Sequence, residues 1–374
     1  MRICTRSVLD DTIRGIRFDE NGECHYCKIY DEMDKLYPVE KRQEDLDAIV
    51  AKIKAKGKGK KYDCVIGVSG GTDSTYTMIK VKELGLRPLA VHLDNGWNSE
   101  IAVKNIKNAC DILGIELYTY VIEWEEFKEL QLSFLKASTP DAEVPTDVAI
   151  HSILVKMAAK EGVKYVLNGH SFRTEFIMPK EWTYMDGKYI KAVQKQFGTK
   201  KLKSFPNYTI FDTVWQNFIK GVKVVPFLNY FEYSKEDAKK VLEKEVGWQY
   251  YGGHHHENTY TKFYQSHLLP KKFGIDKRKT ALSASVLSGK ITRQEALDIL
   301  ENEHHHVDKE TVEFVIRKLG ITQDEFDEIM KLPVKSFRDY PTYYPLIKAM
   351  KGPIKLACKL GLLPMILYYK FLDE

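Results

Sequence analysis

The sequence lacks the features that mark several special classes of protein. Only six of its 374 residues are cysteines, too few for a disulfide scaffold in a chain of this length. It has no run of about eighteen apolar residues, and the first residues, MRICTRSVLDDTIRG, have no apolar signal-peptide core. We therefore expect a reduced, cytoplasmic protein without a transmembrane segment.

Neither sign of charge dominates the composition. There are 57 Lys and Arg residues against 52 Asp and Glu residues, a net charge of +5, which is not typical of a dedicated nucleic-acid-binding protein. Hydrophobic residues make up 44% and charged residues 29%, so the chain is neither disordered nor of low complexity. We expect a cysteine-containing segment with a helix over 1–57, a main domain over 58–232, a helical substrate or partner region over 233–345 and an apolar, basic tail over 346–374.

Strand-like and helix-like segments alternate in the predicted main domain. Apolar runs predict strands at 64–71, 88–96, 116–123, 164–170 and 223–230, and helical spacing predicts helices at 73–85, 99–113 and 147–162. The alternation predicts an α/β fold with a doubly wound, mostly parallel sheet, whose ligands bind beyond the carboxyl ends of the strands. From residue 234 only helices are expected. Capping-box pairs mark three of their starts: Ser234 with Asp237, Thr292 with Glu295, and Thr322 with Glu325.

The strongest motif is SGGTDS at 69–74, between the first strand and the first helix. Its glycines allow close backbone approach, and successive N–H groups at a helix start form an anion-binding nest. Asp73 would repel a phosphate unless a cation lay between them, so we assign Asp73 to Mg²⁺. No lysine follows the glycines, which excludes a Walker A loop. The residues expected to bind ATP are Ser69, Gly70, Gly71, Thr72, Asp73 and Ser74.

SGGTDS resembles the PP-loop of ATP pyrophosphatases, which have an adenine nucleotide alpha hydrolase-like fold. Such enzymes cleave ATP to AMP and pyrophosphate and activate a carbonyl or carboxyl oxygen as an adenylate. The resemblance implies that VHLDNGW at the second strand end holds the adenosine and that NGH at the fourth lies near the phosphates. The residues concerned are His92, Asp94, Asn95, Gly169 and His170.

A polar and aromatic loop follows the fourth strand. Arg173 has the bidentate geometry to hold a phosphate or carboxylate, and Glu175 can bind metal or act as a base. The alternative is an exposed loop with a local Arg–Glu pair. Asp147, near a predicted helix start, is interpreted as a possible cap. The predicted substrate contacts are Arg173, Thr174, Glu175, Trp182, Tyr184, Lys277 and Arg278, although the basic residues at 277–279 fit a solvated turn equally well.

Three successive histidines at 254–256 precede Glu257. Neighbouring histidines point in different directions, so a single three-histidine metal site is not expected. We interpret one or two of them, together with Glu257, as substrate contacts or a proton relay. The predicted catalytic residues are Asp73, Glu175, His255 and Glu257.

The N-terminal segment resembles half of a zinc ribbon. Cys4, Cys24 and Cys27 supply three thiols, but Ser7 stands where a fourth ligand is expected. A structural zinc site usually has four ligands. The alternatives are a zinc ion with an uncertain fourth ligand and a metal-free knuckle packed by hydrophobic contacts.

Beyond SGGTDS, longer motifs occur in order: CTRSVLDDTIRGIRFDENGECHYC, VHLDNGWNS, NGHSFRTE, WTYMDGKYI, VVPFLNY, YYGGHHHENTYTKFYQ and FGIDKRKTALSASVLSG. They resemble the N-acetyl sugar amidotransferases of bacterial surface polysaccharides such as lipopolysaccharide O-antigen, up to about residue 300. Ser7 departs from that pattern, as does Phe176, where a small residue is expected next to the sugar pocket.

The resemblance implies conversion of an acetamido group on a nucleotide-linked sugar to acetamidino, with ATP, Mg²⁺ and ammonia. The chain has no Gly-x-Cys-x-Gly nucleophile elbow, so we expect a separate class I glutaminase subunit to supply the ammonia.

Two other functions stay open at this stage. One is a PP-loop enzyme that modifies tRNA, of the thiolase or lysidine-synthase type, although no basic and aromatic RNA-binding module is present. The other is a non-enzymatic adenine-nucleotide sensor, against which the intact Asp73 argues. The tail at 353–371 is interpreted as a helix packed on the core or on another subunit, and the alternative is a helix at a membrane surface.

Overall fold

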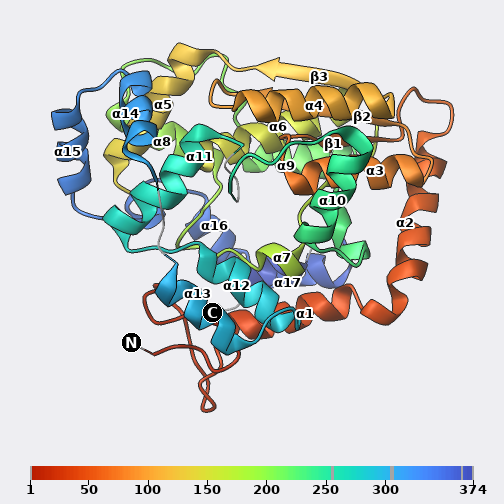
Figure 1. The fold of residues 1–374 in the computed structure, drawn as a ribbon, viewed down its shortest axis with the longest axis horizontal. Coiled ribbons are helices and arrows are strands. Elements are labelled where there is room, and N and C mark those ends of the chain that lie inside the picture. The colour runs from red at the N-terminus through yellow and green to blue at the C-terminus, as the bar shows by residue number, and fades with distance from the viewer. Residues whose placement is uncertain (1, 254–256, 304–306, 364, 373–374) are drawn as a thin grey trace.

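The computed structural model describes residues 2–253, 257–303, 307–363 and 365–372 (Figure 1). Its centre is a five-stranded sheet with the strand order β3-β2-β1-β4-β5, in which every neighbouring pair is parallel. The strands are β1 (Cys64–Gly67), β2 (Pro88–Asp94), β3 (Glu116–Val121), β4 (Tyr165–Asn168) and β5 (Lys223–Pro226). The five predicted strands are confirmed, and so is the α/β class.

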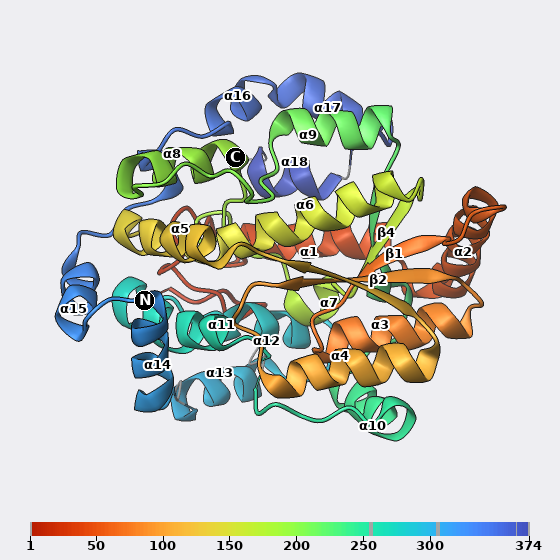
Figure 2. The ribbon, with the colours of Figure 1, turned by 90° about the horizontal axis from the view of Figure 1, so that it is seen from above.

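Helices cover both faces of the sheet. In Figure 2, α3 (Thr72–Glu83) and α4 (Glu100–Leu113) lie below the sheet, while α5 (Trp124–Ala137) and α6 (Val144–Lys160) lie above it. The strand order reverses beside β1, because the chain first adds β2 and β3 on one side and later β4 and β5 on the other. A crevice at the carboxyl end of such a switch point is where open α/β sheets bind ligands.

The remaining elements come before the sheet, between its later strands, or after it. The helices are α1 (His25–Leu36), α2 (Arg42–Gly57), α7 (Phe172–Glu175), α8 (Gly187–Phe197), α9 (Ile210–Val214), α10 (Lys235–Val246), α11 (Thr259–Phe263), α12 (Arg278–Leu287), α13 (Arg293–Asn302), α14 (Lys309–Leu319), α15 (Gln323–Lys331), α16 (Tyr344–Ala349), α17 (Lys351–Lys359) and α18 (Met365–Phe371). Short 3-10 turns lie at η1 (Val39–Lys41), η3 (Phe227–Tyr230) and η5 (Phe337–Asp339), and π-helical turns at η2 (Trp215–Ile219) and η4 (Tyr264–Phe273).

The predicted helix starts after residue 233 are confirmed. Thr292 and Thr322 form full capping boxes with Glu295 and Glu325. At Ser234 the side chain accepts a hydrogen bond from the backbone N–H of Asp237. These caps satisfy N–H groups that the first helical turn leaves without an intrahelical partner.

The start of α6 differs from its prediction, and the difference matters for the site. The helix begins at Val144, with Pro145 in its first turn, where the missing N–H costs nothing. Asp147 was interpreted as a possible cap, but it lies inside the helix. The earlier start turns one face of the first two turns of α6 toward the carboxyl ends of the strands.

Three of the four predicted segments share one buried hydrophobic cluster, and the tail packs against it through the partly buried Ile366, Tyr369 and Phe371. The largest buried cluster contains Cys4 from the cysteine segment, Val65 from β1, Val315 from α14 and Tyr344 from α16. The four-part division of the chain therefore stays a prediction. Within the described residues, no helix combines the length and the apolar character needed to cross a membrane.

Candidate active site

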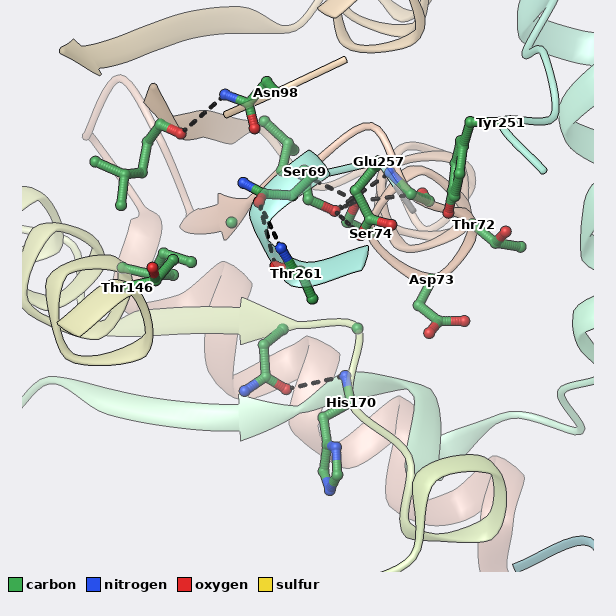
Figure 3. A pocket seen from close by; sticks show the side chains of 18 of the residues that line it. Ser69, Thr72, Asp73, Ser74, Asn98, Thr146, His170, Tyr251, Glu257 and Thr261 are labelled. Atoms are coloured by element: carbon green, nitrogen blue, oxygen red, sulfur yellow. Dashed lines mark hydrogen bonds between the residues drawn. The ribbon is translucent and has the colours of Figure 1, made fainter. Parts of the chain in front are cut away.

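A cavity of about 620 Å³ opens beyond the carboxyl ends of β1, β2 and β4. Its walls come from the loop at 69–74, the ends of the three strands, the first turns of α6, the start of α10 and the segments 250–253 and 257–261 (Figure 3). The predicted residues that line it are Ser69, Gly71, Thr72, Asp73, Ser74, His92, Asn95, Gly169, His170, Glu175, Glu257 and Lys277. Catalytic and ATP-binding candidates from distant parts of the chain thus meet in one place.

The loop holds its shape through contacts that only glycine permits at residue 70. Gly70 has a φ of 78°, and a Cβ atom there would lie 2.3 Å from the carbonyl oxygen of Ala102. Its own carbonyl accepts a hydrogen bond of 2.8 Å from the indole of Trp248. The side chain of Ser69 accepts from the backbone N–H of Gly71 at 3.2 Å and lies 3.2 Å from the hydroxyl of Ser74. Gly70 does not line the cavity. Its packing against Ala102 and Trp248 fixes the backbone conformation of the phosphate loop.

We expect Gly70→Ala to lower the free energy of unfolding by about 2–4 kcal/mol, because it combines a backbone clash with a left-handed conformation. Urea denaturation measures the change. Gly114→Ala is the matched control: Gly114 also has a positive φ (59°), but a Cβ atom there would meet no described residue within 4 Å. We expect a loss of about 1 kcal/mol for that variant. Equal losses for both variants would contradict the close packing at Gly70.

Asp73 lies at the start of α3 and points into the cavity (Figure 3). One carboxylate oxygen accepts a hydrogen bond from the hydroxyl of Tyr233, and the other lies 3.3 Å from the ammonium group of Lys235. Burial, reinforced by the charge of Asp73, raises the pKa of Tyr233, which keeps that phenol protonated. A carboxylate facing a cavity beside a phosphate-binding loop fits Mg²⁺, which takes one or two carboxylates and completes its shell with phosphates and water. The sequence did not predict Lys235, whose ammonium group lies next to the same carboxylate.

Glu257 closes the cavity over the phosphate loop. Its Oε1 accepts a hydrogen bond of 3.4 Å from the hydroxyl of Ser69, 188 residues earlier in the chain. The segment is held in place by backbone bonds from Ser99 N–H to the Glu257 carbonyl (2.8 Å) and from Thr259 N–H to the Trp97 carbonyl (2.9 Å). His255, the neighbouring catalytic candidate, lies outside the described residues.

At the end of β2, the side chains of His92 and Asp94 mainly hold the surrounding backbone in place. The ring of His92 is buried; Nδ1 donates to the Val68 carbonyl at 2.9 Å and Nε2 accepts from Asn98 at 3.1 Å. Burial lowers the pKa of His92, so the ring is neutral and ties β1 to β2. Asp94 does not line the cavity; its carboxylate accepts from the backbone N–H of Gly96 and shapes the turn after β2.

The end of β4 supplies an acid–base pair. Gly169 passes so close to α3 that a Cβ atom would lie 2.8 Å from the backbone of Asp73. The ring of His170 is hydrogen-bonded to the carboxylate of Glu175. Burial opposes protonation of this histidine, but the charge and the hydrogen bond of Glu175 outweigh burial and raise the pKa of His170. The raised pKa makes the neutral form of His170 a stronger base beside the cavity, as suits a group that accepts a proton.

The far end of the cavity is acidic, and the sequence did not predict this group of residues. Glu143 and Asp147, at the start of α6, line it together with Thr261 and Lys277. The hydroxyl of Thr261 donates to Glu143 at 2.6 Å. Burial lowers the pKa of Lys277, and the charges of Asp147, Glu143 and Glu175 oppose that change. The one sequence signal was the PTD at 145–147, whose cap interpretation the structure corrects.

Several predicted substrate residues lie away from the cavity. Arg173 donates to Asp34 through Nε (3.1 Å) and Nη2 (2.5 Å) and to the Tyr37 carbonyl (2.6 Å), so it joins α7 to the end of α1. Arg278 likewise pairs with Asp276 at 2.7 Å. Arg173 was predicted to hold a phosphate or carboxylate of a substrate. Both arginines are instead paired with carboxylates of the protein itself.

The aromatic substrate candidates lie away from the cavity for a different reason. Trp182 and Tyr184 are 3% and 2% exposed, and Tyr184 stacks on Phe337 at 4.2 Å between ring centroids. Phe176, expected to reshape a sugar pocket, is 1% exposed and packs against Tyr30. Thr174 is also buried and bonds to the Ser171 carbonyl. These side chains belong to the core and do not line the cavity.

The three N-terminal cysteines meet in a separate buried cluster. The Sγ atoms of Cys4 and Cys24 each lie 3.6 Å from the Sγ of Cys27, and all three thiols are fully buried. Zinc–thiolate bonds of about 2.3 Å in a tetrahedron place sulfurs about 3.8 Å apart, so the cluster fits a zinc ion. The hydroxyl of Ser7 lies 3.8 Å from the Cys24 sulfur, at the fourth side of the cluster.

Parts of the chain are similar to known proteins. Residues 257–352 match the family model described as "LPS biosynthesis protein WbpG-like, C-terminal domain". The tRNA-specific 2-thiouridylase MnmA of Sulfurimonas denitrificans is 30% identical over 125 residues, which cover 30% of this chain and 35% of that protein. The tRNA(Ile)-lysidine synthase of Chlamydia pneumoniae is 33% identical over 85 residues, which cover 22% and 25%.

Among solved structures, the NH3-dependent NAD synthetase of Campylobacter jejuni aligns over 79% of this chain and 98% of its own, with 12% identity and a TM-score of 0.30. The chain spans about a third or less of the length of the two curated relatives named above. The family match includes several cavity residues: Glu257, Asn258, Thr261, Gln265 and Lys277. Residues 257–352 are thus similar to the WbpG-like C-terminal domain of LPS biosynthesis proteins. The phosphate loop between β1 and α3 of a parallel sheet agrees with the resemblance to PP-loop ATP pyrophosphatases seen in the sequence.

Proposed function

We propose that the chain is the synthase subunit of an ATP-dependent amidotransferase that converts an acetamido group of a nucleotide-linked sugar to acetamidino. One observation carries the proposal: the cavity joins an anion-binding loop to an acid–base pair and to a far end lined by residues of the WbpG-like domain. The reaction needs these three parts, because it uses a nucleotide, removes a proton and acts on a second substrate.

An amide carbon is a poor electrophile, so its oxygen must first become a leaving group. In the proposed reaction the amide oxygen attacks the α-phosphorus of ATP and pyrophosphate departs. Ammonia then attacks the resulting imidate carbon, and AMP leaves with the former amide oxygen, so that an amidine remains. The loop at 69–74 would hold the departing pyrophosphate through its N–H groups and hydroxyls, and Mg²⁺ at Asp73 would offset its charge.

The remaining residues position the reactants and move protons. His170 and Glu175 lie near the loop and would accept the proton that ammonia loses. The far end with Glu143, Asp147 and Lys277 would hold the hydroxyl-rich sugar, because carboxylates accept hydrogen bonds from hydroxyl groups. Holding three reactants in one cavity supplies the orientation that the uncatalysed reaction lacks.

The decisive assay uses a sugar whose acetamido oxygen is ¹⁸O. The protein is incubated with ATP, Mg²⁺, ammonium chloride and a panel of nucleotide-linked acetamido sugars. Transfer of ¹⁸O into AMP, with an amidine product in the mass spectrum, supports the proposal. Formation of AMP only after tRNA is added would instead favour a tRNA-modifying enzyme, in line with the partial similarity to the tRNA-specific enzymes named above.

We also propose that ammonia comes from a separate class I glutaminase subunit. The six cysteines are buried in the structure, whereas a glutaminase nucleophile must reach its substrate. The expected result is ammonia-dependent turnover without glutamine hydrolysis by the purified chain. Release of glutamate from glutamine by the chain alone would contradict it.

The pair formed by His170 and Glu175 makes the stability depend on pH. Because the pKa of His170 is raised above its ordinary value of 6.5, the pair stabilises the fold fully below pH 6.5 and loses that contribution as pH rises through the raised pKa. In Glu175→Gln burial is opposed only by the weaker influence of Asp73, so the pKa of His170 should fall.

The stability difference between wild type and Glu175→Gln should therefore be largest below pH 6.5 and shrink at alkaline pH. Urea denaturation at several pH values measures it, and an NMR titration of the histidine follows the pKa directly. A difference that is constant with pH would show that the carboxylate acts without the charge of His170.

A further inference from the structure

One helix exposes a continuous apolar stripe that the ATP site does not use. In α9 and η2, five apolar residues recur at helical spacing, and each is about half exposed or more: Phe211 (75%), Val214 (50%), Trp215 (52%), Phe218 (48%) and Ile219 (63%). The opposite side of this segment contacts α6. An apolar stripe at this spacing usually faces a core, whereas this one faces outward.

The C-terminal helices expose a second set of apolar side chains. Leu346, Met350, Leu356, Leu360 and Leu362 are between 41% and 66% exposed. The other side of the tail is packed: α18 contacts α1, and the hydroxyl of Tyr369 donates to Glu32 at 3.0 Å. The expected packing of the tail on the core is thus confirmed for its inner side only.

Both sets belong to the same side of the molecule. In Figure 2, α9, α16 and α17 all lie along the upper edge, which is the far side of Figure 1. The active-site cavity is lined from the ends of β1, β2 and β4 and from the starts of α3, α6 and α10. The apolar side chains on α9, η2, α16 and α17 are called the outer face below.

The charge around the outer face has one sign. The segments 199–223 and 340–372 contain ten lysines and one acidic residue, Asp212, which is a charge of +9 compared with +5 for the whole chain. Lys355 and Lys359 are exposed beside Leu356 and Leu360, and Lys220 and Lys223 follow the stripe on η2. Apolar side chains with flanking lysines, including an exposed tryptophan, match the interface of an anionic lipid bilayer.

We propose that the outer face binds the surface of an anionic membrane peripherally. The stripe of α9 and η2 and the leucines of α16 and α17 insert to the level of the headgroups, and the lysines contact lipid phosphates. A lipid bilayer can adapt to two separate apolar patches, whereas a folded partner protein would need a surface complementary in shape to both. This inference does not depend on the ATP chemistry proposed above.

Trp215 allows a direct test, because the four other tryptophans are buried or partly buried. The full chain is mixed with vesicles of phosphatidylcholine containing about 30% phosphatidylglycerol, a proportion that gives a strongly negative surface. Brominated acyl chains should quench Trp215, and the quenching should disappear in Trp215→Tyr. Absence of any binding to these vesicles would overturn the proposal.

Co-sedimentation then tests the two contributions. Phe211→Ser with Ile219→Ser should weaken vesicle binding at least about tenfold, from the lost apolar burial. Lys351, Lys355 and Lys359 changed to Gln should weaken it about fivefold per lysine, and high salt should do the same to wild type. Val121→Ser is the matched control: Val121 is 69% exposed on β3, outside the outer face, and this variant should bind like wild type.

Ultracentrifugation of the same variants separates lipid binding from self-association. If wild type is a dimer without vesicles and Phe211→Ser with Ile219→Ser is monomeric, the outer face is an interface between two copies and the lipid proposal is wrong. Equal binding to neutral and anionic vesicles, or unchanged binding by the lysine variant, would contradict the role of the lysines.

Discussion

Asp73→Asn should reduce formation of AMP by about three orders of magnitude, the loss expected when a group that offsets charge in the transition state is removed. Asp73 points into the cavity from the start of α3, next to the phosphate loop, and is 17% exposed. Asparagine keeps the shape of the side chain and the hydrogen bond with Tyr233 but removes the charge. The measurement is the rate of AMP and pyrophosphate release with ATP, Mg²⁺, ammonium and the sugar.

Binding of ATP should change much less than turnover. Lys235 lies 3.3 Å from Asp73, and it would stay available to the phosphates after the carboxylate charge is gone. Asp111→Asn, at an exposed position of α4, is the control and should react at the wild-type rate. Full turnover by Asp73→Asn would remove Asp73 from the proposed mechanism, and loss of both binding and turnover would indicate a distorted loop.

Cys27→Ala should remove a structural zinc and lower the thermal midpoint by about 4 °C. The sulfur of Cys27 lies 3.6 Å from each of the other two thiols, so its removal leaves too few ligands to hold the metal. Site-bound zinc contributes its binding free energy to folding, and a loss of a few kcal/mol corresponds to a shift of about this size. Metal analysis should give about one zinc per wild-type chain and almost none for the variant.

The effect should reach beyond the cysteine segment. Arg293 of α13 donates to the carbonyl groups of Cys4 and Ser7 at 3.0 and 3.1 Å, and the backbone N–H of Val8 donates to Ser283 of α12. The cysteine cluster is therefore joined by hydrogen bonds to helices of the C-terminal region as well. Hydrogen exchange in α12 and α13 should rise in the variant.

Two further variants separate the metal from simple packing. Cys358→Ala removes a buried cysteine from the tail and should leave the zinc content unchanged. Ser7→Cys places a thiol at the fourth side of the cluster and should raise the chelator concentration needed to remove the metal. Zinc-free wild-type protein, with the same thermal midpoint as Cys27→Ala, would favour the metal-free knuckle.

Local patterns were enough to predict the frame of this protein. Alternation and helical spacing are set by residues within one element, so the five strands and the capped starts at Thr292 and Thr322 follow from the sequence. The phosphate loop is predictable for the same reason: the apolar strand, the two glycines and the helix start that build it are contiguous. Because parallel strands end at one edge, the sequence also predicts that the loop, His92 and His170 meet there.

Contacts between distant segments could not be predicted in this way. Ser69 and Glu257 are 188 residues apart, and no local pattern states that the segment after residue 250 folds over the loop. Arg173, Trp182 and Tyr184 have the chemistry of a binding loop. In the folded chain, however, Arg173 pairs with Asp34, and the two aromatic side chains are buried in the core. The sequence by itself determined the strands of the sheet, the phosphate loop and the three cysteines of the N-terminal cluster. The tertiary structure decided which polar side chains face the cavity, because burial and pairing depend on neighbours that the chain brings together only when it folds.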